Sequence, residues 1–241
     1  MSQDQPGPAS IVLVPGAWLG AWAWDEIVEL LRADGHDVTA ITLPGLESVD
    51  ADRSEIGLQD HVEAVIAEVD AMSGPVVLVG HSAGGAIVHA VVDARPDRIE
   101  RAIYVDAGPL GPGQVVNDEL PIVEGEIPLP EWGVFEDEDL IDLTDELREE
   151  FRTRAVPSPA GVAIDPQRLS DPRRYDVPAT VIACEFPSMM LREFMDQGHP
   201  FTQELAKLTN VEFVDLPTGH WPQFTKPAEL AQAILAATGD T

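Results

Sequence analysis

The pentapeptide Gly80-His81-Ser82-Ala83-Gly84 places a serine between glycines, directly after an apolar run and before a segment of small residues. This is the G-x-S-x-G pattern of a nucleophile elbow, in which a sharp strand-to-helix turn exposes a serine hydroxyl. The turn requires glycines because flanking side chains would clash, and it strains the backbone of the serine. Backbone N–H groups at the start of the following helix favour a developing oxyanion. The pattern predicts that Ser82 is a catalytic nucleophile.

A serine hydroxyl becomes a good nucleophile only when a base removes its proton, and the chain has six histidines that could do so. The side chain of His81, inside the elbow, is expected to point away from Ser82. His61 falls on the face of a predicted helix, which suggests the surface. His220 follows the last predicted strand in a Gly-His-Trp-Pro tetrapeptide. The chain order serine, acid, histidine places the base there, so we predict that His220 is the general base.

The first predicted strand runs into a loop with the sequence Pro15-Gly16-Ala17-Trp18. A loop that leaves the strand beside the elbow can supply one main-chain donor to an oxyanion, and the residue after the nucleophile supplies the other. The N–H groups of Ala17 and Ala83 are therefore the candidates for an oxyanion hole. Each such donor typically contributes roughly 3 kcal/mol to transition-state stabilisation.

The elements that would position these residues follow an alternating order. Short apolar runs indicate buried strands, and apolar residues at helical spacing indicate helices between them. The predicted strands cover residues 11–14, 38–43, 76–79, 102–105, 180–184 and 211–214. The predicted helices cover residues 24–31, 58–69, 86–94, 143–154 and 201–208, and a last one starts near Pro227. This order predicts an α/β fold with a mostly parallel central sheet that helices cover on both faces.

The regular pattern stops between residues 108 and 175, a stretch rich in proline, glycine and acidic residues. An insertion of this length is either a lid over a site or a poorly ordered loop. Its apolar members favour a lid; they are Leu129, Trp132, Val134 and Phe135. We therefore expect one domain, with a core of residues 1–107 and 176–241 and a lid or cap of residues 108–175.

Three motifs, Val-Pro-Gly-Ala-Trp-Leu-Gly-Ala-Trp-Ala-Trp, Gly-His-Ser-Ala-Gly-Gly and Gly-His-Trp-Pro, make the chain resemble the α/β-hydrolase superfamily. The first motif is similar to that of small esterases, a branch that includes plant methyl esterases and hydroxynitrile lyases. The resemblance covers nearly the whole chain outside residues 108–175. It implies an eight-stranded, mostly parallel sheet, a lid between the sixth and seventh core strands, and a Ser-His-acid triad.

The resemblance leaves two positions for the acid of this triad. Most relatives place an aspartate in the loop after the seventh strand, where this chain has Glu185 followed by Phe and Pro. Some relatives, haloalkane dehalogenases among them, place the acid at the end of the sixth strand, where this chain has Asp106. Asp106 is the preferred acid and Glu185 the alternative acid, with Asp196 a distant third.

Several large apolar residues adjoin the expected site and are candidates for substrate binding. Trp18 and Trp221 flank the two predicted catalytic loops, Trp132 lies in the expected lid, and Met189 follows the seventh strand. Each of these side chains could equally be a packing residue of the core. The sequence therefore proposes a substrate pocket made of Trp18, Trp221, Met189 and Trp132, without specifying its shape.

Composition limits the partners of the 241-residue chain. Its formal charge of −29 argues against nucleic acid and against an anionic membrane surface, because phosphate would be repelled. The acidic residues serve solubility or, alternatively, steer a cationic substrate. No apolar stretch approaches the roughly 20 residues that span a bilayer. The oligomeric state is open, and a homodimer is compatible with the sequence.

Location and cofactors follow from a few further features. The segment Met1 to Ser10 lacks the basic group and apolar core of a secretory signal, which favours a cytoplasmic protein. Cys184 is the one cysteine, so the chain cannot form an internal disulfide and is unsuited to a cysteine-based metal site. We expect neither a metal nor a cofactor.

The expected chemistry is transfer of an acyl group through Ser82, in a carboxylesterase that acts on a small or medium ester. A first alternative is a lyase of the hydroxynitrile lyase type, whose members also use a threonine near the first strand and a lysine beside the histidine. This chain has Ala17 and Trp221 in those regions. A second alternative is a ligand receptor on the same fold with little turnover.

Overall fold

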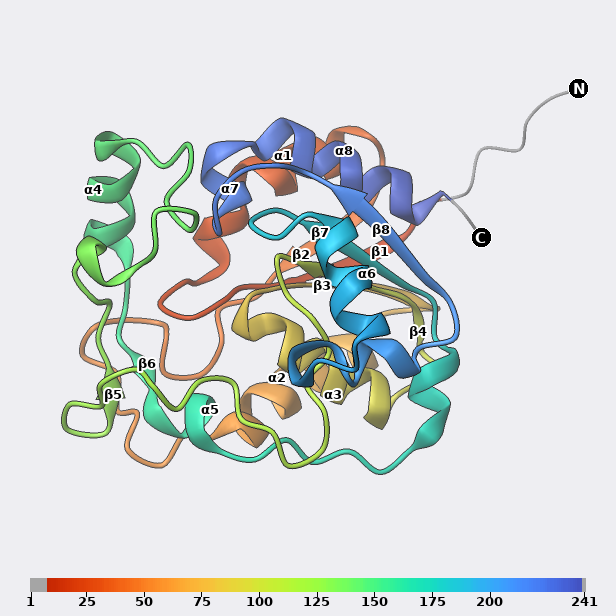
Figure 1. Ribbon diagram of the computed structural model, residues 1–241, viewed down its shortest axis with the longest axis horizontal. Helices are drawn as coiled ribbons and strands as arrows, with labels where there is room; N and C mark the ends of the chain where they lie inside the picture. Colours follow the sequence, from red (N-terminus) through yellow and green to blue (C-terminus); the bar gives the residue numbers. More distant parts are fainter. Residues whose placement is uncertain (1–7, 240–241) are drawn as a thin grey trace, which may run out of the picture.

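In the computed structural model, which describes residues 8–239, six strands form one parallel sheet in the order β2-β1-β3-β4-β7-β8 (Figure 1). These strands are β1 (Ser10–Val14), β2 (Asp37–Ala40), β3 (Val76–His81), β4 (Ile99–Val105), β7 (Ala179–Ala183) and β8 (Val211–Asp215). The predicted α/β class with a parallel sheet is confirmed. The strand count is a correction, because eight strands were expected and the sheet of the described residues has six. Only Pro8 and Ala9 precede β1 among these residues, so they form no strand before it.

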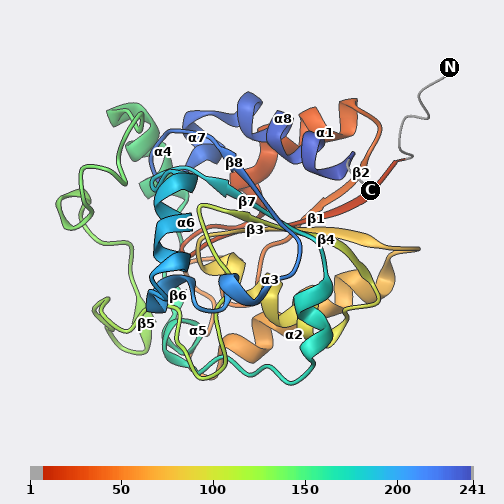
Figure 2. The ribbon, with the colours of Figure 1, turned by 45° about the vertical axis from the view of Figure 1, so that its right-hand side comes forward.

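Helices cover both faces of this sheet (Figure 2). Helices α1 (Asp25–Ala33) and α8 (Pro227–Thr238) pack on one face, and α2 (Leu58–Ala71) and α3 (Ala83–Ala94) on the other. Alternate residues of β1 serve the two layers: Ile11 and Leu13 pack with α1 and α8, whereas Val12 packs with α2 and α3. Strands buried on both faces need continuous apolar sequence, which explains why the apolar runs predicted the strands from the sequence. Among residues 8–239, no helix has both the length and the apolar character needed to cross a membrane.

The insertion between β4 and β7 contains the paired strands β5 (Glu126–Ile127) and β6 (Ser158–Pro159), a 3-10 turn (Trp132–Val134), α4 (Asp145–Arg154), α5 (Ala160–Ile164) and a second 3-10 turn (Pro172–Asp176). It begins at one end of the sheet, where α4, β5 and β6 lie, and its last part returns to the opposite end before β7 (Figure 1). Its aromatic residues pack against the residue that follows His220: Trp132 and Phe135 both make edge-to-face contacts with Trp221, with ring centroids 5.9 and 5.3 Å apart. These contacts hold the insertion against the loop after His220.

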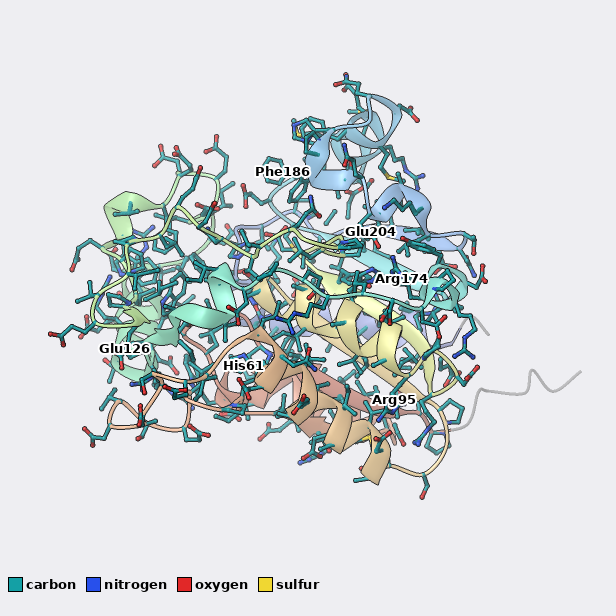
Figure 3. The ribbon with its side chains drawn as sticks, turned by 90° about the horizontal axis from the view of Figure 1, so that it is seen from below. His61, Arg95, Glu126, Arg174, Phe186 and Glu204 are labelled. Atoms are coloured by element: carbon teal, nitrogen blue, oxygen red, sulfur yellow. The ribbon has the colours of Figure 1, made fainter. Side chains whose placement is uncertain are left out.

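A buried polar network fastens the end of the insertion to α3 (Figure 3). The guanidinium of Arg174 contacts both Glu204 Oε1 and Asp93 Oδ1 at 3.1 Å. Glu204 also contacts His89 Nε2 at 3.2 Å, and His89 Nδ1 lies 3.0 Å from the hydroxyl of Tyr104. All five side chains are buried. Because each charge in this network has a partner, it can remain inside the protein.

The region between β7 and β8 differs from the prediction. The helix expected over residues 201–208 consists of two 3-10 turns, Pro200–Thr202 and Leu205–Lys207, and helix α6 (Ser188–Asp196) was not expected. Glu204, between the two turns, points into the buried network, and these contacts hold its backbone. Tertiary contacts thus overrode the local helical pattern. Helix α7 (Pro222–Thr225), after His220, is a further short element.

Candidate active site

Ser82 lies between β3 and α3, in a backbone conformation with φ 52° and ψ −124°. The positive φ is unusual for a residue with a side chain and stores local strain. The two flanking glycines are required by close contacts. A Cβ on Gly80 would lie 2.6 Å from the carbonyl oxygen of Gly84, and one on Gly84 would lie 2.7 Å from that of Val14. The elbow predicted from the sequence is therefore present.

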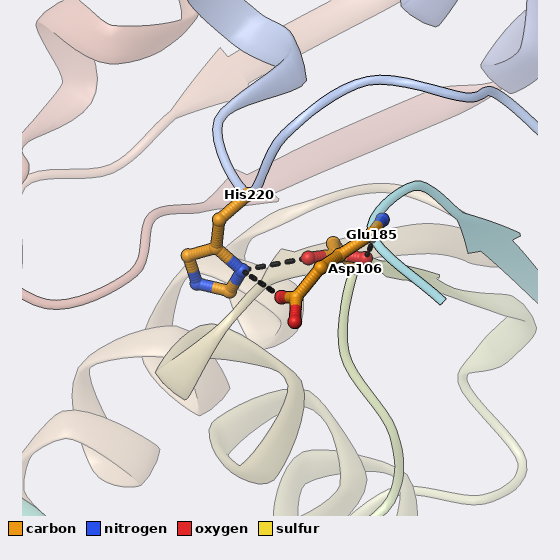
Figure 4. A group of neighbouring side chains, drawn as sticks. All are labelled: Asp106, Glu185 and His220. Carbon is orange, nitrogen blue, oxygen red and sulfur yellow. Dashed lines mark hydrogen bonds and ion pairs between the residues drawn. The ribbon is translucent and has the colours of Figure 1, made fainter. Parts of the chain in front are cut away.

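The imidazole of His220 lies between the serine and a carboxylate. Its Nε2 is 2.8 Å from Ser82 Oγ. Its Nδ1 is 2.6 Å from Asp106 Oδ2, the contact drawn in Figure 4. With the proton on Nδ1, the imidazole donates to Asp106 and presents a bare Nε2 to the serine hydroxyl. This is the tautomer in which a histidine can accept a proton from serine.

Asp106 is oriented by the strand next to its own. It follows the last residue of β4, its φ is 41°, and its main-chain N–H donates to the carbonyl of Ile182 in β7. Its second carboxylate oxygen, Oδ1, accepts hydrogen bonds from the N–H groups of Cys184 and Glu185, at 3.1 and 3.0 Å. The pairing of β4 with β7 thus fixes the carboxylate that faces His220.

Glu185, the alternative acid, lies beside this pair without a direct hydrogen bond to the imidazole. Its Oε2 is 3.9 Å from His220 Nδ1 (Figure 4). The structure therefore places both candidate acids next to His220, with Asp106 in contact and Glu185 farther away. Asp196, at the last turn of α6, is not among the partners of His220.

The electrostatics of the pair favour the charged forms. Burial alone would lower the pKa of His220, but the hydrogen bond and charge of Asp106 and the nearby Glu185 and Asp139 carboxyls raise it above its ordinary value. Burial would likewise raise the pKa of Asp106, yet its hydrogen bond to His220 and the histidine charge lower it. A basic imidazole beside an ionised carboxylate suits proton acceptance from a serine hydroxyl.

His81 supports the base from behind. The ring is fully buried, and its Nε2 lies 2.7 Å from the main-chain carbonyl oxygen of His220. Burial and the neighbouring His220 lower the pKa of His81 to about 3, so the ring is neutral and donates through Nε2. Through this hydrogen bond the His81 ring positions the backbone of the base.

The two residues proposed to supply main-chain donors border the same space as the serine. Ala17 and Ala83 both line the cavity described below together with Ser82. Ala83 is the first residue of α3, so its N–H has no partner within the helix. The next N–H in the early loop, that of Trp18, is taken up by Ser158 Oγ at 2.8 Å. The arrangement leaves Ala17 and Ala83 as the candidate oxyanion hole.

A cavity of about 570 Å³ opens onto Ser82. Trp18 and Trp221 line it, as do Phe135 and Val162 from the insertion and Phe186 after β7. Phe186 is labelled in Figure 3. The walls are mainly apolar, which suits an uncharged organic substrate. The acidic residues that line it are Asp106, Glu119, Glu136, Asp139 and Glu185, and its described lining contains no lysine or arginine.

Two of the expected pocket residues lie outside this cavity. Met189 is 77% exposed because α6 turns Leu191, two residues later, toward the core. Trp132 does not line the cavity; it packs against Phe135 and Trp221, which do line it. Both expectations are corrected, since neither side chain borders the space in front of Ser82.

His61 is a further correction, because it is 2% exposed and lines the cavity instead of lying on the surface. Its Nε2 lies 2.8 Å from the carbonyl of Pro44, and burial lowers its pKa to about 4. The sequence also gave no reason to single out Asp139 or Ser158, which contact the His220 and Trp18 loops. No periodicity marks such residues, since they act through loop contacts.

One group of described side chains has the spacing of metal ligands: Asp106, Glu185 and His220, whose ligand atoms lie within 4.8 Å of one another. Asp106 and His220 are already bound to each other, and Asp106 Oδ1 accepts two main-chain N–H groups. A cation would have to displace the hydrogen bond at His220 Nδ1. The donor set fits a proton relay better than a metal site.

Comparisons with known proteins place this geometry in context. A model of the alpha/beta hydrolase family matches residues 11–233. A pyrethroid hydrolase from Sphingobium wenxiniae is 27% identical over 244 aligned positions, which cover 93% of this chain and 85% of that protein. A carbendazim hydrolyzing esterase from a Nocardioides species is 34% identical over 101 residues, which cover 41% of this chain and 42% of that protein. The chain thus spans less than half the length of the carbendazim hydrolyzing esterase.

Solved structures share the fold over nearly the whole length. An extracellular alpha/beta-hydrolase from a Paenibacillus species superposes with a TM-score of 0.77 at 23% identity and covers 97% of this chain and 100% of that one. A methylesterase from Arabidopsis superposes with a TM-score of 0.71 at 21% identity, covering 95% and 98%. At these identities the likeness shows the shared architecture, including the insertion.

Proposed function

Because the chain belongs to the alpha/beta hydrolase family, we propose that it is a serine esterase with Ser82 as nucleophile, His220 as general base and Asp106 as the acid. The observation that carries this proposal is the continuous hydrogen-bond chain from Ser82 Oγ through His220 to Asp106. These hydrogen bonds end at Ser82, which borders a cavity of about 570 Å³. The relatives named as esterases and hydrolases support ester hydrolysis.

The proposed reaction proceeds through an acyl-serine intermediate. Ser82 Oγ attacks the ester carbonyl while His220 Nε2 takes the hydroxyl proton, and the N–H groups of Ala17 and Ala83 bind the oxyanion. His220 then gives the proton to the departing alcohol. A water molecule, deprotonated by the same nitrogen, attacks the acyl group and restores Ser82.

The proposed substrate is a small or medium carboxylic ester without a negative charge. The apolar walls, with Trp18, Trp221 and Phe135, favour an aliphatic or aromatic group on either side of the ester. The acidic lining disfavours a carboxylate on the substrate through like-charge repulsion. We also propose that residues 108–175 act as the lid, because they supply many of the residues that line the cavity.

A hydroxynitrile lyase and a receptor remain the alternative functions. The lyase needs a substrate hydroxyl to meet a threonine and a lysine, whereas this chain has Ala17 and Trp221 in the corresponding regions. A receptor would have no use for a serine held in a strained conformation against a basic imidazole. Both are therefore weaker than the esterase proposal.

Labelling with a fluorophosphonate, followed by mass analysis, tests the proposal directly. A single adduct on Ser82 is expected, together with hydrolysis of p-nitrophenyl esters that peaks at one acyl length. Ser82→Ala should lose the adduct and the turnover. Ser158 is a second serine that lines the cavity, and Ser158→Ala should keep the adduct. A folded protein without adduct and without turnover would favour the lyase or the receptor.

A further inference from the structure

Two carboxyl groups from distant parts of the chain meet beside His220. Glu185 follows β7, and Asp139 belongs to the insertion. Both line the cavity at Ser82, and a hydrogen bond between the two side chains is one cause of the raised pKa of Glu185. Ionised carboxylates accept hydrogen bonds but donate none, so one member of this pair must carry a proton.

The surroundings of Glu185 favour that protonated form. Its side chain is 15% exposed, and its Oε2 lies 3.9 Å from His220 Nδ1. Burial, the Asp139 carboxyl and the Asp106 carboxylate raise the pKa of Glu185 to about 8, against the opposing charge of His220. The groups that face it are thus Asp106 after β4, Asp139 from the insertion and His220 itself, with His81 of β3 next to the imidazole.

Asp139 is also part of the scaffold of the base. Its main-chain carbonyl accepts the N–H of His220 at 2.8 Å, and the carbonyl of Ile141 accepts the N–H of Gly219 at 3.1 Å. A Cβ on Gly219 would collide with the Asp139 carbonyl oxygen, so the two segments touch closely. The position of the imidazole therefore depends on how residues 139–141 of the insertion are held.

We propose that Glu185 is a positioning residue whose proton joins it to Asp139, forming a latch that holds the insertion against the loop of His220. The latch depends on the proposed esterase function only for its expected effect on turnover. When the proton leaves, two carboxylates face each other beside Asp106, and their repulsion loosens residues 139–141. The imidazole then loses its support and proton transfer from Ser82 slows.

The first test is the pH dependence of kcat/KM, with each profile normalised to its own maximum. The wild-type profile should fall on the alkaline side with a midpoint near pH 8, where the proton of the pair is lost. In Glu185→Gln the amide donates to Asp139 at every pH, so this alkaline fall should disappear. A Glu185→Gln profile that keeps the wild-type alkaline fall would overturn the latch.

Asp139→Asn is the matched variant, because its amide can donate to an ionised Glu185. It too should remove the alkaline fall, but only Asp139→Asn should shift the acid side. Asp139→Asn leaves a full negative charge on Glu185 near His220, which raises the pKa of the base and moves the acid side to higher pH. Glu185→Gln should not move it upward. If Glu185 and Asp139 merely filled space, the variants would show neither the loss of the alkaline fall nor the shift of the acid side.

A second measurement does not require turnover. Hydrogen exchange reports the amides of Gly219 and His220, whose partners are the carbonyls of Ile141 and Asp139. Their protection factors should fall by about tenfold or more between about pH 7 and about pH 9 in the wild type, but not in Glu185→Gln. This fall in a protein that hydrolyses no ester would support the latch and reject the esterase. Serine-dependent turnover with unchanged protection and profile would reject the latch alone.

Discussion

Nδ1 of His220 lies 2.6 Å from Oδ2 of Asp106, although the two residues are 114 positions apart in the chain. The carboxylate cannot turn away, because its other oxygen accepts the N–H groups of Cys184 and Glu185. The imidazole is thus held with its bare nitrogen toward Ser82. Removing the negative charge of Asp106 should remove the preference for this tautomer.

Asp106→Asn is expected to lower kcat by about 10³- to 10⁴-fold, with little change in KM, because the asparagine no longer stabilises the imidazolium. Glu185→Gln should lower kcat far less at its optimal pH, since Glu185 Oε2 lies 3.9 Å from Nδ1. Steady-state kinetics on a p-nitrophenyl ester measures both. An equal or deeper loss in Glu185→Gln would transfer the role of the acid to Glu185.

Gly16→Ala should impair the nucleophile. A Cβ on Gly16 would lie 2.9 Å from both Cβ of Ser82 and Nδ1 of His81, so the elbow or the early loop has to shift. We expect kcat/KM to fall by about tenfold or more, because displacements near 1 Å at a reacting group cost up to about 10²-fold. Gly133→Ala is the control, since a Cβ there meets no atom within 4 Å. Equal activity of both variants would contradict the crowding argument.

Glu185→Gln should change how stability depends on pH. The pKa of Glu185 rises from 4.5 to about 8 on folding, so between these values the folded wild type binds more protons than the unfolded chain. Its free energy of unfolding therefore falls as the pH rises through this window, by at most about 1.4 kcal/mol per pH unit. In urea unfolding, the free energy of unfolding of Glu185→Gln relative to that of the wild type should therefore increase as the pH rises from about 5 to about 8. Parallel curves would contradict the raised pKa.

Arg174→Met should destabilise the fold by about 3–5 kcal/mol, because it leaves Asp93 buried without its cation and leaves Glu204 with Lys207 alone. The neighbouring Arg173 provides a control of the same type. Its side chain is 57% exposed and pairs with Asp97 and Asp171 at the surface, so Arg173→Met should destabilise the fold far less. Urea denaturation gives both values, and similar losses in the two variants would show that the buried network contributes little.

Two esters of equal acyl length test the charge of the cavity: p-nitrophenyl butyrate and mono-p-nitrophenyl succinate. The succinate carries a carboxylate at the end of its acyl chain, which would face an acidic lining that includes Glu119 and Glu136. We expect kcat/KM for the succinate to be about tenfold or more lower, and the gap to narrow as salt screens the repulsion. Equal values at low salt would show that the acidic side chains point away from bound substrate.

The sequence by itself determined the parallel sheet, the elbow at Ser82 and the late position of His220. These features are local: strands buried on both faces need continuous apolar runs, and a turn as tight as the elbow excludes side chains at Gly80 and Gly84. Their signals therefore survive in short stretches of sequence.

Only the tertiary structure decided which acid contacts His220, where Met189 and His61 lie, and that residues 200–208 form turns instead of a helix. Asp106 and Glu185 both follow neighbouring strands, so the sequence brings both to the same edge. What separates them is the direction of each side chain, which depends on main-chain N–H groups from the adjacent strand and on Asp139 of the insertion. Such contacts join residues far apart in the chain, and no local pattern records them.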